Sequence, residues 1–161
     1  MSGETPRESL GQALGMIPSG IFIVTTTREP VRSAYVGSWI QQAAFEPPAI
    51  TIAINRQRPL LALLAPGCGI GVNILGRRQA QLYARFEKGF TLGEDPFVGI
   101  AITTAMSGAP LLREAFAYLD CRVQTTLDAG DHRVVLAEVL AGAVQQTGEP
   151  MTYTRRSGFT Y

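Results

Sequence analysis

Two long β-type segments near the end of the chain, joined by a short polar turn, constrain the fold more than any other feature. In residues 118–126 (YLDCRVQTT), apolar side chains alternate with polar ones, as they do in a strand with one buried face. Residues 132–144 (HRVVLAEVLAGAV) form a second apolar run. The turn 128–131 (DAGD) between them is rich in Asp and Gly, and it predicts an antiparallel hairpin.

The remaining elements indicate a mainly β fold with a few helices around it. Dense β-branched and apolar runs predict strands at 20–27, 49–54 and 69–75, and a further strand followed by a loop within 32–45. Helical patterns cover 8–17 (with Ser9 as a candidate N-cap), 59–65 and 77–86, whereas 87–110 is irregular. Strands and helices do not alternate regularly, which argues against a parallel doubly wound sheet. A small β-barrel with peripheral helices fits this order best.

Length and composition indicate the number of domains, the kind of partner and the cellular location. The 161 residues suit a single domain over 1–161, with 1–8 as a flexible N-terminus. Hydrophobic residues make up 46% and charged residues 17%, a surplus that either predicts an oligomer or reflects a generous core. The formal net charge of +1 gives no general field for nucleic acid or an anionic membrane. No signal peptide and no apolar run of roughly 20 residues is present, so a cytoplasmic location is expected.

Most common catalytic and metal-binding patterns do not occur. Cys68 and Cys121 lie far apart in apolar stretches, as is typical of buried, unreactive thiols. His132 is the single histidine, which excludes a His-rich metal site. The segment 67–73 (GCGIGVN) is close to a dinucleotide fingerprint, but Val72 stands at the last glycine position. Paired carboxylates and a Ser/His/Asp set are not evident either, so chemistry without a protein nucleophile, such as hydride transfer between cofactors, is favoured.

A group of arginines is the candidate anion site. Arg56 and Arg58 follow the strand 49–54 directly, at the expected start of the helix 59–65, where guanidinium groups and a helix N-terminus favour a phosphate. Arg85, at the end of the next predicted helix, would add a third cation. The alternatives are solvated loop arginines for the first two and an ordinary helix C-terminal arginine for the third.

Three further features have both a structural and a ligand-binding interpretation. Residues 33–39 (SAYVGSW) combine small residues with two aromatics, which lets a planar ring lie against the backbone. Trp39 would stack on that ring, or belong to the core or an interface. Asn73 lies in an apolar strand, where its amide either ties down backbone, the favoured role, or bonds a ligand. His132 contacts a ligand or is an ordinary turn histidine, which its position alone favours.

Taken in order, these segments resemble the flavin reductase-like, FMN-binding split-barrel family over about residues 10–155. The likeness rests on the ordered set ALGMIPSGIFIVTTT, SAYVGSWIQQAAFEPPAITIAI, GVNIL, YARFEKGF, SGAPLL, AYLDCRV and DAGDHRVVLAEV. Within the family, the segments SAYVGSWIQQAAFEPP, AYLDCRV and AGDH are most similar to the flavin reductase domain of diflavin flavodiiron proteins. The resemblance implies a Greek-key split barrel that forms a homodimer. It also implies FMN, or else FAD, near the subunit interface, and NADH or NADPH as the electron donor.

The resemblance assigns roles by position. The residues that would hold the isoalloxazine ring and the ribityl chain are Tyr35, Val36, Gly37, Ser38 and Trp39. The residues that would reach the phosphate are Asn55, Arg56, Gln57 and Arg58, with Asn73 and Arg85 nearby. His132 would lie on the nicotinamide side. Two positions depart from the family pattern. The stretch 55–60 (NRQRPL) has no hydroxyl side chains where many relatives have Ser or Thr, and Trp39 stands where many have serine. Arginine can replace the hydroxyls as a bidentate donor, or flavin binding is weaker or altered, so flavin selectivity is left open.

Two functions follow as hypotheses. The first is an NAD(P)H:flavin oxidoreductase that passes electrons to free flavin or to a partner protein. The second is an FMN-binding electron-transfer module that is reduced only within a larger flavodiiron-type assembly. A flavin-free structural relative is a third interpretation. The sequence does not choose between NADH and NADPH or name the final acceptor.

Overall fold

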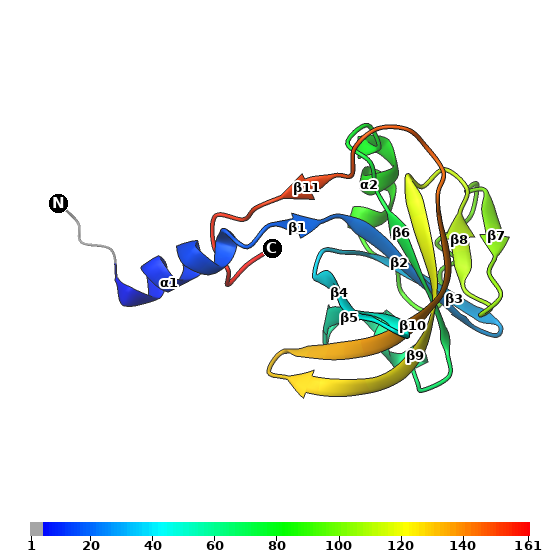
Figure 1. Cartoon of the computed structure of the whole chain (residues 1–161), viewed down its shortest axis with the longest axis horizontal. Coiled ribbons are helices and arrows are strands. Elements are labelled where there is room, and N and C mark those ends of the chain that lie inside the picture. The colour runs from blue at the N-terminus through cyan, green and yellow to red at the C-terminus, as the bar shows by residue number, and fades with distance from the viewer. Residues whose placement is uncertain (1–4) are drawn as a thin grey trace.

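The computed structural model describes residues 5–161 and shows a mainly β chain built around one seven-stranded antiparallel sheet (Figure 1). The strand order is β3-β2-β6-β9-β10-β5-β4. The strands are β2 (Phe22–Arg28), β3 (Val31–Gly37), β4 (Ile40–Phe45), β5 (Pro48–Asn55), β6 (Gly69–Ile74), β9 (Ala117–Ala129) and β10 (His132–Val144). The two edge strands, β3 and β4, are consecutive in the chain but do not pair with each other. The sheet therefore curls back on itself without closing into a complete barrel.

Smaller elements surround this sheet. Two short antiparallel pairs join β1 (Ser19–Gly20) to β11 (Thr152–Tyr153), and β7 (Ile102–Thr104) to β8 (Pro110–Leu112). The helical elements are α1 (Pro6–Gly15), the 3₁₀ turn η1 (Pro59–Leu63) and α2 (Ala80–Glu87). In Figure 1, α1, β1 and β11 extend away from the curled sheet as an arm.

The predicted hairpin is the central pair of the sheet. β9 and β10 pair from His132↔Ala129 to Val144↔Ala117, with irregularities at Leu136/Ala137 and Val139/Ala141. Gly130 in the turn has φ 61°, a left-handed conformation that glycine adopts without steric cost. The hairpin prediction is therefore confirmed, and both strands extend to the turn itself.

Both faces of the sheet are covered, which explains why its strands are rich in apolar residues on either side. Ile23 and Val24 are neighbours on β2 and are both fully buried, because successive side chains point to opposite faces. Val24 belongs to the core enclosed by the curled sheet, with members from β3, β5, β6, β9 and β10. Ile23 packs with Phe86 and Leu112 in a second core under α2 and β8.

The structure corrects four sequence predictions about elements. The loop expected after the strand in 32–45 is the edge strand β4, which pairs with β5. The helix expected at 59–65 is only a 3₁₀ turn of 5 residues. The irregular stretch 87–110 contains β7 and the start of β8, whose pairing is too short to give a periodic pattern. The expected helix at 8–17 is shifted towards the N-terminus and ends at Gly15.

The N-terminal helix is capped by Thr5 and not by Ser9. Thr5 Oγ1 accepts a hydrogen bond from the Glu8 backbone N–H, and the Glu8 carboxylate accepts one from the Thr5 N–H, which is a capping box. Of the flexible N-terminus predicted for 1–8, residues 1–4 lie outside the described part, while 6–8 belong to α1. None of the helices within residues 5–161 is long and apolar enough to cross a bilayer.

We predict that Cys121 does not react with thiol reagents in the folded protein. Its side chain is fully buried in the core enclosed by the sheet, and this burial, followed by the nearby Asp120, raises the pKa of the Cys121 thiol to about 12. A thiolate is the reactive form. Titration with a chromogenic disulfide at pH 8 should therefore leave Cys121 unmodified until denaturant is added. Modification of Cys121 in the native protein, mapped by peptide mass, would contradict this packing.

Candidate functional site

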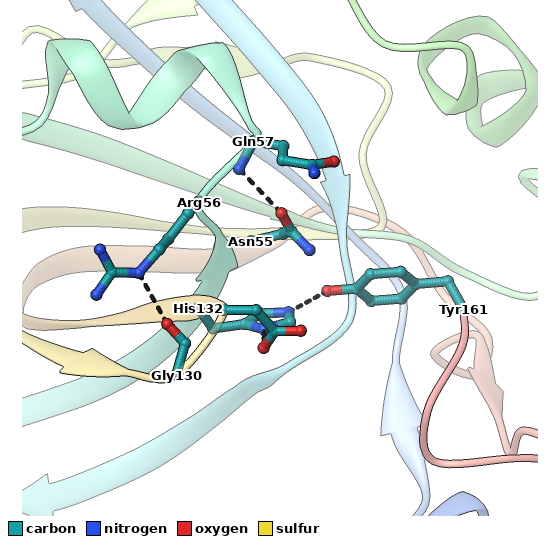
Figure 2. A network of polar contacts seen from close by, with 7 residues as sticks. Asn55, Arg56, Gln57, Gly130, His132 and Tyr161 are labelled. Atoms are coloured by element: carbon teal, nitrogen blue, oxygen red, sulfur yellow. Dashed lines mark hydrogen bonds and ion pairs between the residues drawn. The ribbon is translucent and has the colours of Figure 1, made fainter.

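The candidate site is assembled where the end of β5 meets the turn of the β9–β10 hairpin. β5 pairs with β10 in the register His132↔Asn55, and the Arg56 backbone N–H donates to the Asp131 carbonyl oxygen at 3.0 Å. The loop after β5 therefore lies against the hairpin turn, although about 75 residues separate the two in the chain. Figure 2 shows these two segments facing each other. The Asn55 side-chain oxygen accepts a bond of 2.9 Å from the Gln57 backbone N–H and shapes the loop.

The two arginines of this loop have different roles. Arg56 is exposed, donates from Nε to the Gly130 carbonyl oxygen at 2.9 Å and forms an ion pair of 3.1 Å with Asp128. It secures the hairpin turn and lines neither of the cavities described below. Arg58 is half-buried, lies 5.5 Å from the Tyr35 ring centroid and has no carboxylate partner within residues 5–161. Of these two arginines, only Arg58 is therefore available to an anion. The sequence predicted that a helix N-terminus at this point would also attract the phosphate. This prediction is wrong, because η1 is a single short 3₁₀ turn.

The segment 35–39 alternates between the core and the surface. Tyr35 points into the core, and burial raises the pKa of its hydroxyl. That hydroxyl is the one buried side-chain polar atom without a hydrogen-bond partner among residues 5–161. A Cβ added to Gly37 would stand 3.1 Å from the Tyr35 oxygen, so the absence of a side chain at Gly37 makes room for Tyr35. Val36 and Ser38 have the opposite orientation and line a cavity.

Two neighbouring cavities flank Arg58. The first, which we call the aromatic cavity, has a volume of about 590 Å³ and is lined by Val36, Ser38, Arg58, Tyr83, Glu87, Tyr153 and Tyr161, among others. The second, the charged cavity, has a volume of about 620 Å³ and is lined by Asn55, Gln57, Arg58, Lys88, Glu94 and Tyr161, among others. Both volumes are in the range of small-molecule and cofactor sites. Arg58 and Tyr161 line both cavities and so form their junction.

His132 lies at the edge of this junction in a chain of hydrogen bonds. Its Nδ1 lies 2.7 Å from the Asp131 carboxylate and its Nε2 lies 2.5 Å from the Tyr161 hydroxyl. Figure 2 shows Tyr161 reaching across from the last segment of the chain to His132. The Trp39 ring lies 4.6 Å from the His132 ring and 5.6 Å from the Tyr161 ring, and Arg155 lies 4.8 Å from the Trp39 centroid. The hydrogen bond from His132 lowers the pKa of Asp131, whereas burial raises the pKa of Tyr161.

The predicted site residues that line neither cavity are Tyr35, Gly37, Trp39, Arg56, Asn73, Arg85 and His132. Of these, Asn73 and Arg85 are bonded to other parts of the fold. Asn73 is fully buried, donates from Nδ2 to the Ile23 carbonyl oxygen at 2.9 Å and accepts from the Leu112 N–H at 2.7 Å. Its amide joins β6 to β2 and β8, which is the structural role that the sequence favoured. Arg85 donates to the Val98 carbonyl oxygen on the outside of α2 and lines neither cavity.

Sequence reasoning missed several residues that line the two cavities. They are Tyr83, Lys88, Tyr153 and Tyr161. Lys88 adds a cation to the charged cavity, which Glu94 also lines. Hydrogen bonds from Thr91 lower the pKa of the Glu94 carboxyl. For Tyr153 and Tyr161, a signal was available in the sequence, because aromatic and basic residues cluster in 153–161 (YTRRSGFTY).

The arrangement suits a ligand with a planar aromatic part and an anionic part. The aromatic cavity offers Val36, Ser38 and the tyrosines Tyr83 and Tyr153, and the charged cavity offers Arg58 and Lys88. Within the described residues 5–161, no cluster of His, Cys, Asp or Glu is arranged to hold a metal ion.

A family model for the flavin reductase like domain matches residues 14–160. The chain belongs to this family. The family prediction made from the ordered segments is confirmed, and so is the mainly β, split-barrel class. Flavin binding is a property of the family, and the residues at the junction of the two cavities fit a flavin nucleotide.

Two relatives in Synechocystis are diflavin flavoproteins. Diflavin flavoprotein A 3 is 38% identical over 151 residues, which cover 93% of this chain and 25% of the relative. Diflavin flavoprotein A 1 is 34% identical over 154 residues, which cover 94% of this chain and 27% of the relative. The chain thus spans about a quarter of the length of these relatives.

Solved structures of flavin reductases have the same fold. The NADH:FAD oxidoreductase SgcE6 of Streptomyces globisporus superimposes with a TM-score of 0.82 at 22% identity, over 96% of this chain and 94% of that one. The styrene monooxygenase flavin reductase of Pseudomonas putida has a TM-score of 0.73 at 25% identity, over 89% and 90% of the two chains.

We predict that Asn73→Ala destabilises the protein without removing a ligand contact. The substitution leaves the Leu112 N–H without its acceptor and removes one donor to the Ile23 carbonyl oxygen in a fully buried position, which should lower the free energy of unfolding by about 1–3 kcal/mol. Urea denaturation measures this loss. Arg85→Ala is the matched control and should cost less than about 0.5 kcal/mol. An Asn73→Ala protein of normal stability that no longer binds flavin would place Asn73 in the site.

Proposed function

We propose that this chain is an NAD(P)H:flavin oxidoreductase that binds FMN, takes hydride from a nicotinamide nucleotide and delivers the electrons to free flavin or a partner protein. The observation that carries the proposal is Arg58. It is a half-buried guanidinium with no carboxylate partner in residues 5–161, and it stands between a cavity lined by tyrosines and a cavity lined by polar and charged groups. A guanidinium in such a position favours a phosphate, which it can bind through two parallel hydrogen bonds.

Different residues around Arg58 would bind the phosphate and the ring of the nucleotide. Arg58 and Lys88 would hold the phosphate in the charged cavity, and Val36 and Ser38 would present backbone to the planar ring in the aromatic cavity. When bound, the flavin supplies the redox chemistry, because it accepts a hydride and passes electrons on. FMN is the flavin in this proposal, because the family resemblance implies FMN first and FAD as the alternative.

His132 is proposed for the nicotinamide side. Its Nδ1–H donates to the Asp131 carboxylate when the ring is neutral, so that Nε2 accepts from the Tyr161 hydroxyl. This fixes one tautomer of a ring that is 7% exposed. His132 thus has a fixed orientation beside Trp39, with Nε2 facing Tyr161.

A second candidate is an electron-transfer module that holds FMN and is reduced within a larger flavodiiron-type assembly. The lengths of the relatives favour it, because this chain covers only 25% of diflavin flavoprotein A 3. The two candidates differ in turnover and not in the site.

We also propose that the chain forms a homodimer. The arm carries exposed apolar side chains on and after α1 (Leu10, Met16 and Ile17). Beside it, a groove of about 500 Å³ lies between α1, β4 and β5 and is lined by Leu14, Ile17, Trp39, Ile40 and Val134, among others. Burial of such apolar surface between subunits would stabilise a dimer. A cytoplasmic location remains a prediction from the sequence.

The first test is the visible absorbance spectrum of protein that has been incubated with FMN and desalted, recorded before and after anaerobic addition of NADH or NADPH. Flavin bands that survive desalting and bleach with one nucleotide are expected for the reductase. A colourless protein that oxidises NAD(P)H with added FMN would mean that flavin is a substrate. Retained but unbleached flavin would favour the electron-transfer module. A colourless and inactive protein would contradict both candidates.

The phosphate assignment is tested by comparing two adjacent arginines. Arg58→Ala should weaken binding of FMN, but not of riboflavin, by ~1.5–3 kcal/mol, or about 10- to 150-fold, since the lost hydrogen bond is charge-assisted. Arg56→Ala is the matched control, because its guanidinium faces Gly130 and Asp128, and it should leave both affinities unchanged. Fluorescence titration gives the dissociation constants. Equal losses for FMN and riboflavin in Arg58→Ala would remove Arg58 from the phosphate site.

A further inference from the structure

Tyr161 stands at the point where the two cavities meet. It lines both of them, together with Arg58. A flavin nucleotide whose ring occupies the aromatic cavity and whose phosphate occupies the charged cavity has to pass through this junction. The Tyr161 side chain therefore occupies space along the path of the ligand.

The segment 154–161 is held firmly at its base and weakly at its tip. At the base, the Arg155 N–H donates to the Gly15 carbonyl oxygen at 2.9 Å, and the Gly158 N–H donates to the Gly11 carbonyl oxygen at 2.6 Å. A Cβ on Gly158 would lie 2.1 Å from Leu14 Cβ, so this approach to α1 requires glycine. The base is thus bound to α1 by backbone contacts that a ligand in the cavities does not touch.

The tip has few contacts. Tyr161 is 64% exposed, and its hydroxyl bonds His132 Nε2 at 2.5 Å while its ring lies 5.6 Å from the Trp39 ring. The neighbouring Thr160 carbonyl accepts a bond of 3.2 Å from Arg155 Nη1. Contacts of this number and exposure are broken at low cost.

We propose that Tyr161 is a gate that competes with flavin for the junction of the two cavities and swings out on the anchored base when flavin binds. The inference rests on the proposed flavin-binding function and deepens it, because it explains how the same site could exchange its flavin. While the gate is closed, only the open fraction of the protein binds flavin. The apparent dissociation constant rises as that fraction falls. Opening also frees His132 Nε2, which the gate occupies when closed.

The affinity test uses the full chain and two substitutions at one position. Tyr161→Ala removes the gate and should bind FMN about 3- to 10-fold more tightly than the unsubstituted protein, as expected for a gate closed for most of the time. Tyr161→Phe keeps the ring but loses the bond to His132, so its affinity should fall between the two. Phe45→Ala removes an aromatic side chain that is 88% exposed and lines neither cavity, and it should leave the affinity unchanged. Fluorescence titration with FMN provides the three comparisons.

A second measurement follows the segment itself. Limited chymotrypsin digestion cleaves after Phe159, which follows the last anchoring contact at Gly158, and FMN should speed cleavage there about threefold or more if binding releases Tyr161. The exposed Phe45 serves as the internal reference site, and mass spectrometry assigns each cut. A segment that closes over the ligand would instead be protected by FMN.

The outcomes separate the two proposals. Tighter FMN binding by Tyr161→Ala, with faster cleavage of the unsubstituted protein after Phe159 when FMN is present, supports the gate. Equal or weaker binding by Tyr161→Ala, or protection by FMN, overturns the gate and leaves the flavin-binding function standing. If neither the unsubstituted protein nor Tyr161→Ala binds FMN, both the gate and the proposed function are overturned.

Discussion

The pairing of β5 with β10 is the constraint on which the site depends. Its register sets His132 opposite Asn55, and the backbone bond from Arg56 to Asp131 extends the pairing past the end of both strands. Because a slip of one residue would turn every side chain to the other face, the apolar alternation of the two strands fixes which residues meet at this corner. The position of Arg58 relative to His132 follows from that register.

The two arginines after β5 have different roles, because one stabilises the fold and the other is available to a ligand. Arg56 is satisfied by the hairpin turn, through Gly130 and Asp128. Arg58 has no such partner among residues 5–161 and lies over the Tyr35 ring. A guanidinium above an aromatic ring keeps its hydrogen-bond donors free while the ring supports its charge. That difference arises from packing, and it separates a structural cation from one that is available to a ligand.

The sequence predicted the elements that depend on local patterns. The β9–β10 hairpin, the strands β2, β5 and β6 and the structural role of Asn73 were anticipated, because alternation and buried amides leave clear signals. β4 was missed because QQAAF in an exposed edge strand has little periodic contrast. The sequence did not distinguish the role of Arg56 from that of Arg58, because the two differ only in their tertiary contacts. Tyr161 was missed because its place in the site depends on a segment that returns along α1.

Backbone contacts connect the arm to the segment that reaches the site. α1 accepts hydrogen bonds from Arg155 and Gly158, and the same segment places Tyr161 between the two cavities. Leu10, Met16 and Ile17 leave an apolar surface exposed on and just after α1. In the proposed homodimer, α1 would therefore contribute to the subunit contact and also support the segment that carries Tyr161.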